Sequence, residues 1–238
     1  MSDVWKKNLE FWEKHYYSPN VESQVFRFFG RILKGDLGLP NKNPKSTLID
    51  FGCGEGSAVN FFNQNGFDSY GLDISSSYIE QAKKFFPKIS NKFFRIPLDS
   101  FDINDLCETV KLESQVDVIT SIQALYYLPK SQFNHFLDLA YNSLKTGGIF
   151  YATMMSEQEE LFYDNSEIVE NGDGWMREVT FSTSRYSVDN YFMHFIKDKN
   201  DLINKFSVFE PLHIGEYTNR FHSEDGSGHH FTFCGIKR

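Results

Sequence analysis

The first forty residues carry apolar side chains at helical spacing. Trp5, Leu9 and Trp12 recur every three or four positions, which places them on one face of a helix. The stretch Tyr17-Ser18-Pro19-Asn20 interrupts this pattern. Apolar residues at helical spacing then resume with Val25, Phe28, Phe29, Ile32 and Leu33. The pattern predicts two helices, divided at the proline-containing stretch.

Residues 45–155 alternate short apolar runs with helical stripes. Helices between the runs are expected to end at Asn65-Gly66, at Pro87 and near Gly147-Gly148, because glycine and proline close helices. This alternation indicates successive βαβ units and therefore a doubly wound, mostly parallel sheet. Its strands, typical of a buried parallel sheet, are expected at 47–51, 69–73, 92–96, 116–121 and 148–154.

The alternation stops after residue 155. Two β-like runs at 177–181 and 191–196 predict a hairpin within an inserted flap. A short helix at 201–206 and strand-like runs at 212–217 and 230–236 complete the chain. We interpret the chain as one domain with four parts: a helical lid at 1–40, a core at 45–155, a substrate flap at 156–198, and a terminal helix and strands at 199–238.

Length and charge limit the classes of function. A chain of 238 residues is long enough for one α/β domain, and most of its 25 phenylalanines are expected to fill the core. The formal net charge of −8 and the pI near 5.4 argue against nonspecific attraction to nucleic acid or to an anionic membrane. A small molecule, or a neutral or basic partner, suits this charge better.

Cysteine and histidine positions give no metal-ligand spacing. Three widely separated cysteines, Cys53, Cys107 and Cys234, favour a reducing, cytoplasmic location. No apolar run is long enough to predict a membrane span or a signal peptide. No metal is expected from the clustered residues near the C-terminus, which are His222, Glu224, Asp225, His229 and His230.

The segment Gly52-Cys53-Gly54-Glu55-Gly56 follows the first predicted strand and opens a predicted helix. Glycines at this position let a ligand approach the backbone at the carboxyl end of the strand. A dinucleotide fingerprint requires its third glycine three residues after the second, where Ser57 stands here. Asp50 adds a carboxylate beside the ligand, which suits an ammonium or sulfonium group better than a diphosphate. Both features disfavour NAD.

Asp73 ends the second predicted strand, 21 residues after Gly52. An acid in this place accepts hydrogen bonds from both ribose hydroxyls of a nucleotide. The following serines also make Asp73 a good helix N-cap, and the two uses are compatible.

Four segments in sequence order resemble the successive motifs of class I S-adenosylmethionine-dependent methyltransferases: Leu48 to Gly56, Gly71 to Ser75, Asp117 to Ser121, and Leu144 to Gly148. The resemblance covers roughly residues 45–155. It implies a seven-stranded, mostly parallel sheet with an antiparallel last strand, and S-adenosylmethionine as the cofactor, leaving S-adenosylhomocysteine as the product.

The resemblance also implies residue roles. Asp50 would hold the methionine amino group, Asp73 the ribose, and Ile74 the adenine, while Gly52 and Gly54 form the floor of the site. The complete expected cofactor-binding set is Tyr17, Asp50, Gly52, Cys53, Gly54, Asp73, Ile74, Asp99, Ser100, Ser121 and Gln123.

Catalytic residues are less well defined by the sequence. Tyr126 and Tyr127 occupy the stretch where many members of the family carry a His or Tyr pair facing the acceptor, although two tyrosines at a helix start equally suit a hydrophobic core. The candidates for catalysis are Tyr126, His194 in the flap, and His229, with His230 as its neighbour.

We therefore expect S-adenosylmethionine-dependent methyl transfer to the oxygen or nitrogen of a small molecule, with natural-product or surface-sugar biosynthesis as the setting. The same βαβ geometry leaves an NAD(P)-dependent oxidoreductase as one alternative. Another is a protein-modifying or noncatalytic relative that acts through a partner.

Overall fold

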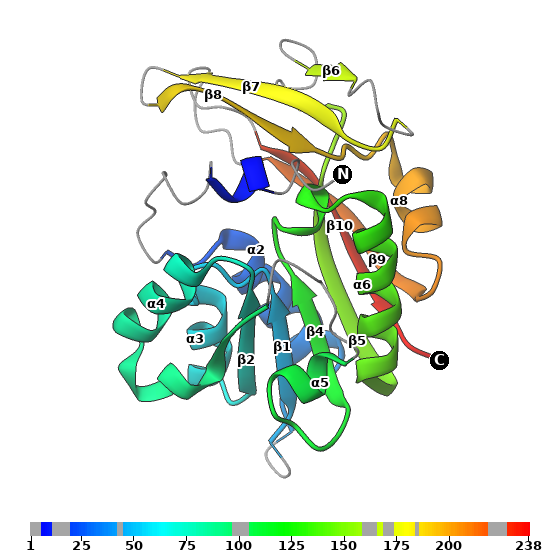
Figure 1. The fold of residues 1–238 in the computed structure, drawn as a ribbon. Coiled ribbons are helices and arrows are strands. Elements are labelled where there is room, and N and C mark those ends of the chain that lie inside the picture. Colours follow the sequence, from blue (N-terminus) through cyan, green and yellow to red (C-terminus); the bar gives the residue numbers. More distant parts are fainter. Residues whose placement is uncertain are drawn as a thin grey trace.

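The strands predicted between residues 45 and 155 lie side by side in a seven-stranded sheet (Figure 1). The computed structural model describes residues 6–10, 20–41, 45–96, 105–158, 166–168, 174–183, 186–218 and 228–238. The sheet order is β3-β2-β1-β4-β5-β10-β9. The strands are β1 (Thr47–Phe51), β2 (Asp68–Asp73), β3 (Phe93–Arg95), β4 (Val116–Ser121), β5 (Leu144–Met155), β9 (Glu210–Thr218) and β10 (His229–Ile236).

The predicted sheet architecture is confirmed. Strands β1 to β5 pair in parallel, whereas β10 runs antiparallel to both of its neighbours, β5 and β9. Strand β1 lies between β2 and β4, with Asp50 opposite Gly71 on one side and Thr120 on the other. The chain order reverses at this point, and in open α/β sheets such a switch point is where ligands bind, beyond the carboxyl ends of the strands.

Helices cover both faces of the sheet. Alternate residues of β1 contribute to different layers of the core: Ile49 and Phe51 belong to the cluster that includes α6, whereas Leu48 packs with the N-terminal helices and α3. The helices are α2 (Ser23–Arg27), η1 (Phe28–Asp36), α3 (Ser57–Gln64), α4 (Ser76–Phe85), η2 (Pro87–Lys92), α5 (Leu106–Thr109), η3 (Leu125–Tyr127), α6 (Lys130–Ser143) and α8 (Lys199–Lys205). In the described ranges, none is long and apolar enough to cross a membrane.

One predicted helix end is wrong. Helix α6 ends at Ser143, and β5 begins with the next residue instead of at Gly148. The glycine pair makes an irregularity at the start of β5, where Gly147 has a φ of 79°. It also pairs with the C-terminal segment, since Gly147 donates a backbone hydrogen bond to Lys237 and the Lys237 amide donates one to Gly148. Tertiary pairing thus overrides the usual role of glycine as a helix terminator.

A second sheet lies above one end of the first (Figure 1). It consists of antiparallel strands β6 (Ser166–Ile168), β7 (Arg177–Thr183) and β8 (Tyr186–Met193). The predicted hairpin is present, but its second strand starts earlier than expected and ends at Met193. Ile196, expected within that strand, instead forms an isolated parallel bridge with Ser156.

Three consecutive backbone carbonyls at η3 hold this second sheet in place. The Tyr126 carbonyl accepts a hydrogen bond from the His194 backbone amide at 2.7 Å, and the Leu128 carbonyl accepts one from Trp175 Nε1 at 3.0 Å. The intervening Tyr127 carbonyl accepts a weaker one, at 3.4 Å, from the side chain of Asn8. The second sheet therefore docks on the turn that follows β4.

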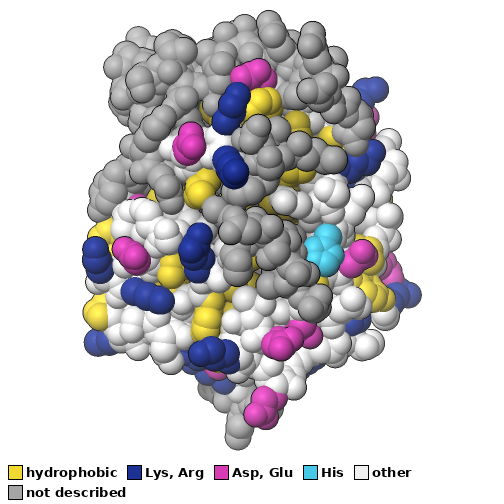
Figure 2. Space-filling model, viewed as in Figure 1, with side chains coloured by type: hydrophobic (Ala, Val, Ile, Leu, Met, Phe, Trp, Pro, Cys, Tyr) yellow, Lys and Arg dark blue, Asp and Glu magenta, His cyan; other side chains and the backbone are white. Residues whose placement is uncertain are grey.

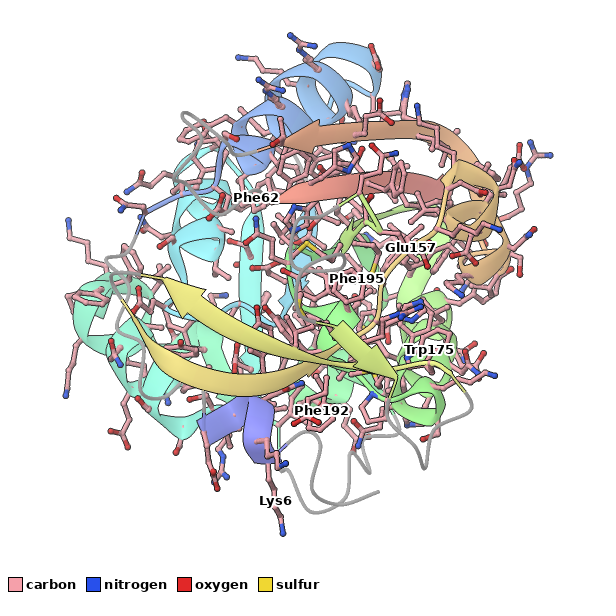
Figure 3. All side chains as sticks on the ribbon, turned by 90° about the horizontal axis from the view of Figure 1, so that it is seen from above. Lys6, Phe62, Glu157, Trp175, Phe192 and Phe195 are labelled. Carbon is pink, nitrogen blue, oxygen red and sulfur yellow. The ribbon has the colours of Figure 1, made fainter. Side chains whose placement is uncertain are left out.

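Asn8 joins the N-terminal segment to the same assembly. Its amide donates to the Phe192 carbonyl at 2.8 Å and accepts from the Phe192 amide at 2.7 Å, so that it pairs with β8 as a backbone unit would. Figure 3 shows Phe192 on β8 close to the N-terminal helical turn that carries Lys6. The N-terminal segment thus lies between the two sheets.

Phenylalanine fills the core, as expected from composition. Phe150 is fully buried and stacks on Phe209 with ring centroids 4.5 Å apart, and Phe136, Phe206 and Phe233 surround it. This aromatic cluster joins β5 and β10 to α6 and α8.

Replacing Phe150 with alanine is expected to lower the free energy of unfolding by about 3 to 5 kcal/mol, because the surrounding rings only partly fill the space left behind. Chemical denaturation measures the loss. Phe26→Ala is the matched control, since the Phe26 side chain is 51% exposed, and it is expected to cost less than about 1 kcal/mol. Equal losses for the two variants would contradict the central position of Phe150.

Candidate cofactor site

The loop after β1 is shaped by glycines in left-handed conformations. Gly52 has a φ of 74°, and a Cβ atom there would lie 2.3 Å from that of Ala124, so no larger residue fits. Gly54 has a φ of 50°, and a Cβ atom there would meet nothing within 4 Å. Gly52 therefore allows close packing against the turn after β4, whereas Gly54 exposes backbone to open space.

Asp73 holds this loop through backbone hydrogen bonds. Its Oδ2 accepts from the Gly54 amide at 2.8 Å, and its Oδ1 accepts from the Ser75 amide at 2.8 Å. A carboxylate offers about four acceptor positions, so these bonds are compatible with further donors such as hydroxyls. The prediction that Asp73 also serves as a helix N-cap is wrong, because Ser75 caps α4 by accepting from the Tyr78 amide.

Asp50 is a buried acid at the end of β1. Its side chain is only 3% exposed, and its Oδ1 accepts a hydrogen bond from Thr120 Oγ1 at 2.6 Å. Burial, and to a smaller extent the charge of Asp73, raise the pKa of Asp50 to about 7, against the lowering effect of the Thr120 hydrogen bond. No cationic side chain in the described parts of the chain pairs with Asp50. A ligand that carries positive charge would compensate this carboxylate.

A cavity of about 490 Å³ opens beside the loop, a size typical of ligand sites. One part is lined by the loop itself, by Asp50 and Asp73, and by Ile74, Ser75, Tyr78 and Ile96. The rest is lined by the N-terminal segment and by the turn after β4, with the residues Asn8, Leu9, Glu22, Ile122, Gln123, Ala124, Tyr126, Tyr127, Leu128 and Gln132.

Most of the expected cofactor residues meet at this cavity. Asp50, Gly52, Cys53, Gly54, Asp73, Ile74 and Gln123 line it. Ser121 is fully buried and donates its hydroxyl to the Phe51 carbonyl at 3.0 Å, so it supports the loop from below. Tyr17, Asp99 and Ser100 lie outside the described residues.

The catalytic candidates do not lie together. Tyr126 lines the cavity, is 2% exposed, and has a pKa that burial raises well above its usual value, so its phenol stays protonated near neutral pH. The His194 ring stacks on Trp175 at 3.7 Å, with Nδ1 2.7 Å from the Trp175 carbonyl. Neither His194 nor His229 is among the residues that line the cavity. Of the three candidates, only Tyr126 is placed to touch a bound molecule.

His230 is buried next to this region. Its Nδ1 lies 3.0 Å from the Gly228 carbonyl, and its ring stacks on Tyr217 with centroids 5.0 Å apart. Desolvation lowers the pKa of His230 to about 4, so the ring is neutral at physiological pH. In the parts of the chain that the structure describes, no three His, Cys, Asp or Glu side chains are grouped as metal ligands.

Sequence reasoning missed several polar residues of the cavity, among them Asn8, Glu22, Tyr78 and Gln132. Tyr78 belongs to α4, where an aromatic residue is as typical of the core as of a binding site. Glu22 and Gln132 occupy polar positions at the starts of helices, where polar residues are common for local reasons. Only their spatial position distinguishes them from solvent-facing residues.

Comparison with known proteins gives a consistent result. A family model described as a methyltransferase domain matches residues 42–209, more than half of the chain. Among curated proteins, no sequence matches. A solved methyltransferase from Methanosarcina mazei is 13% identical, with a TM-score of 0.66 over 92% of this chain and 98% of that one.

Two further solved structures are similar. Magnesium protoporphyrin IX methyltransferase from Synechocystis is 13% identical, with a TM-score of 0.60 over all of this chain and 95% of that one. The glycopeptide N-methyltransferase MtfA is 11% identical, with a TM-score of 0.60 over 91% and 93% of the two chains. At these identities the likeness shows a shared fold. Together with the family match, it leads to one conclusion: the chain belongs to the methyltransferase domain family, and its resemblance to class I S-adenosylmethionine-dependent methyltransferases is confirmed.

Proposed function

We propose that the chain transfers the methyl group of S-adenosylmethionine to a small molecule bound at the Tyr126 end of the cavity. The observation that supports this most is the continuity of the cavity, which joins Asp50 and Asp73 to Tyr126, Tyr127 and Gln132. One part suits the cofactor, and the other leaves room for an acceptor. The family match favours methyl transfer over the nicotinamide-dependent alternative.

The residues of the loop part fit the cofactor. Asp50, a buried carboxylate at the end of β1, would take the ammonium group of the methionine portion. Asp73, fixed by Gly54 and Ser75, would accept hydrogen bonds from the ribose hydroxyls, and Ile74 would pack against the adenine. Gly54 leaves the space that the cofactor needs.

When bound, S-adenosylmethionine supplies a methyl group that its sulfonium already activates, so the protein mainly orients the acceptor and excludes water. Tyr126 is suited to orienting, because its neutral hydroxyl can donate or accept a hydrogen bond and the residue lines the cavity. Asn8 and the docked second sheet cover the site. The role of His194 or His229 as a general base stays a prediction. Neither residue lines the cavity.

Two observations support a small-molecule acceptor. The volume of the cavity is that of a site for small ligands. Positive and negative side chains are interspersed on the described surface in Figure 2, and no basic patch that would attract nucleic acid appears on that face. Methylation of oxygen or nitrogen, in natural-product or surface-sugar biosynthesis, is the proposed setting.

Thermal denaturation with added ligands tests the cofactor. S-adenosylhomocysteine is expected to raise the melting temperature in a concentration-dependent way, because it binds only the folded state. NADH is expected to have no effect. Stabilisation by NADH without stabilisation by S-adenosylhomocysteine would overturn the proposed function. Transfer of a labelled methyl group to a panel of small acceptors then separates an active enzyme from a noncatalytic relative.

Replacing Asp73 with alanine should weaken S-adenosylhomocysteine binding by about 1 to 3 kcal/mol, since ribose hydroxyls lose an acceptor and the Gly54 amide loses its partner. Isothermal titration calorimetry measures the change. Asp105→Ala serves as the control, because Asp105 caps α5 away from the cavity. An unchanged affinity in the Asp73 variant would refute the ribose role.

Asp50→Asn should stabilise the cofactor-free protein while weakening cofactor binding. The folded pKa of about 7 exceeds the ordinary 3.8, so the folded state binds more protons and ionising Asp50 costs stability as pH rises from about 4 to about 7. At pH 8 we expect the variant to be more stable by on the order of 1 to 3 kcal/mol, a gain that shrinks toward pH 4.

The affinity for the cofactor should change with pH in the direction opposite to the stability: it should rise as pH rises. Binding an ammonium group requires the ionised acid, so the wild-type affinity for S-adenosylhomocysteine should fall as pH drops below about 7. The Asn variant should bind weakly at every pH and lack this dependence. Denaturation without ligand and calorimetry at pH 5 and 8 check both effects. A variant that is less stable than the wild type at pH 8 would contradict the buried-charge explanation.

A further inference from the structure

The charged residues that line the cavity in the described parts of the chain are all acidic. Four carboxylates line it, from Glu22, Asp50, Glu55 and Asp73, and no Lys, Arg or His is among the described lining residues. The proposed cofactor accounts for Asp50 and Asp73, and Glu55 belongs to the same loop. Glu22 comes from the N-terminal segment instead, so its position calls for a separate explanation.

Glu22 stands at the start of α2 but does not act as its cap. It occupies the N-cap position, where a side chain commonly bonds the first free amides, yet it makes no such hydrogen bond. Its backbone carbonyl accepts a hydrogen bond from the Val25 amide at 3.0 Å, but no hydrogen bond or ion pair to its side chain occurs among the described residues. Its carboxylate is near enough to Tyr126 and Tyr217 to raise the pKa of both phenols. Glu22 is exposed, and it lines the same cavity as Tyr126 and Tyr127.

Aromatic rings stand at that same end. Tyr126 and Tyr127 both line the cavity, with ring centroids 4.5 Å apart and planes inclined at 56°. The Tyr217 hydroxyl lies just beyond, where it accepts a hydrogen bond from Gln123 Nε2 at 3.3 Å. The faces of aromatic rings attract cations, and a carboxylate gives a protonated amine a charge-assisted hydrogen bond. Acid and rings together favour a positively charged group.

From this juxtaposition we infer that the acceptor molecule carries an amine that is protonated or quaternary, and that Glu22, Tyr126 and Tyr127 bind it. These carboxylates would repel an anionic acceptor, since no Lys, Arg or His among the described lining residues compensates their charge. The amine fixes the orientation of the acceptor, whichever atom receives the methyl group. This inference rests on the proposed function, because it assigns the substrate class of the same cavity.

Calorimetry on the protein saturated with S-adenosylhomocysteine tests the inference with three probes of the same ring and different charge. These are tyramine (cationic), 2-(4-hydroxyphenyl)ethanol (neutral) and 4-hydroxyphenylacetate (anionic). Tyramine is expected to bind at least about tenfold more tightly than the anion, with the neutral probe in between. Equal or tighter binding of the anion, or no detectable binding of tyramine, would overturn the inference.

The variant Glu22→Gln tests whether Glu22 causes the preference for a cationic probe. It should reduce the preference for tyramine over the neutral probe severalfold and leave S-adenosylhomocysteine affinity unchanged, which also shows that the variant folds. Glu80→Gln is the control, since Glu80 is exposed on α4 and outside the cavity lining. A preference that persists in Glu22→Gln would overturn the role of Glu22. If S-adenosylhomocysteine does not bind the wild-type protein at all, the proposed function itself is overturned.

Discussion

The carboxylate of Asp73 is the interaction on which the cofactor site depends. By accepting hydrogen bonds from the amides of Gly54 and Ser75, it ties the loop after β1 to the end of β2. The Leu72 carbonyl adds two bonds from the Gly52 and Cys53 amides, at 2.8 and 3.0 Å. These bonds turn the chain out of β1 so that the Gly54 backbone faces open space. In the proposed function, the same acid accepts hydrogen bonds from the ribose of the cofactor.

Asp50 shows how such a site costs stability. Burial beside Asp73 disfavours its charge, and Thr120 offsets this only in part. A sequence selected only for stability would place an apolar or amide side chain here. The carboxylate is useful where a positively charged ligand restores the balance, which is how strained or uncompensated groups come to gather at functional sites.

The turn after β4 connects this site with the elements that cover it. Its carbonyls at residues 126–128 accept hydrogen bonds from His194, Trp175 and Asn8, while Tyr126 and Tyr127 line the cavity. One short segment thus anchors the second sheet and the N-terminal segment and also lines the acceptor end. A change in this turn would therefore alter both the cover and the substrate surface.

The sequence by itself determined the parallel strands and the glycine loop, because each depends on local patterns: alternating apolar runs, glycine spacing, and an acid at a strand end. The reversed β10 was expected only from the resemblance to class I methyltransferases. The sequence pattern misplaced the end of α6, since Gly147 and Gly148 pair with a C-terminal segment that is distant in sequence. Only the tertiary structure decided that Glu22 and Tyr126 line one cavity, whereas His194 stacks on Trp175 and does not line it. Contacts of this kind join residues far apart along the chain, and the local pattern of apolar and polar residues does not predict them.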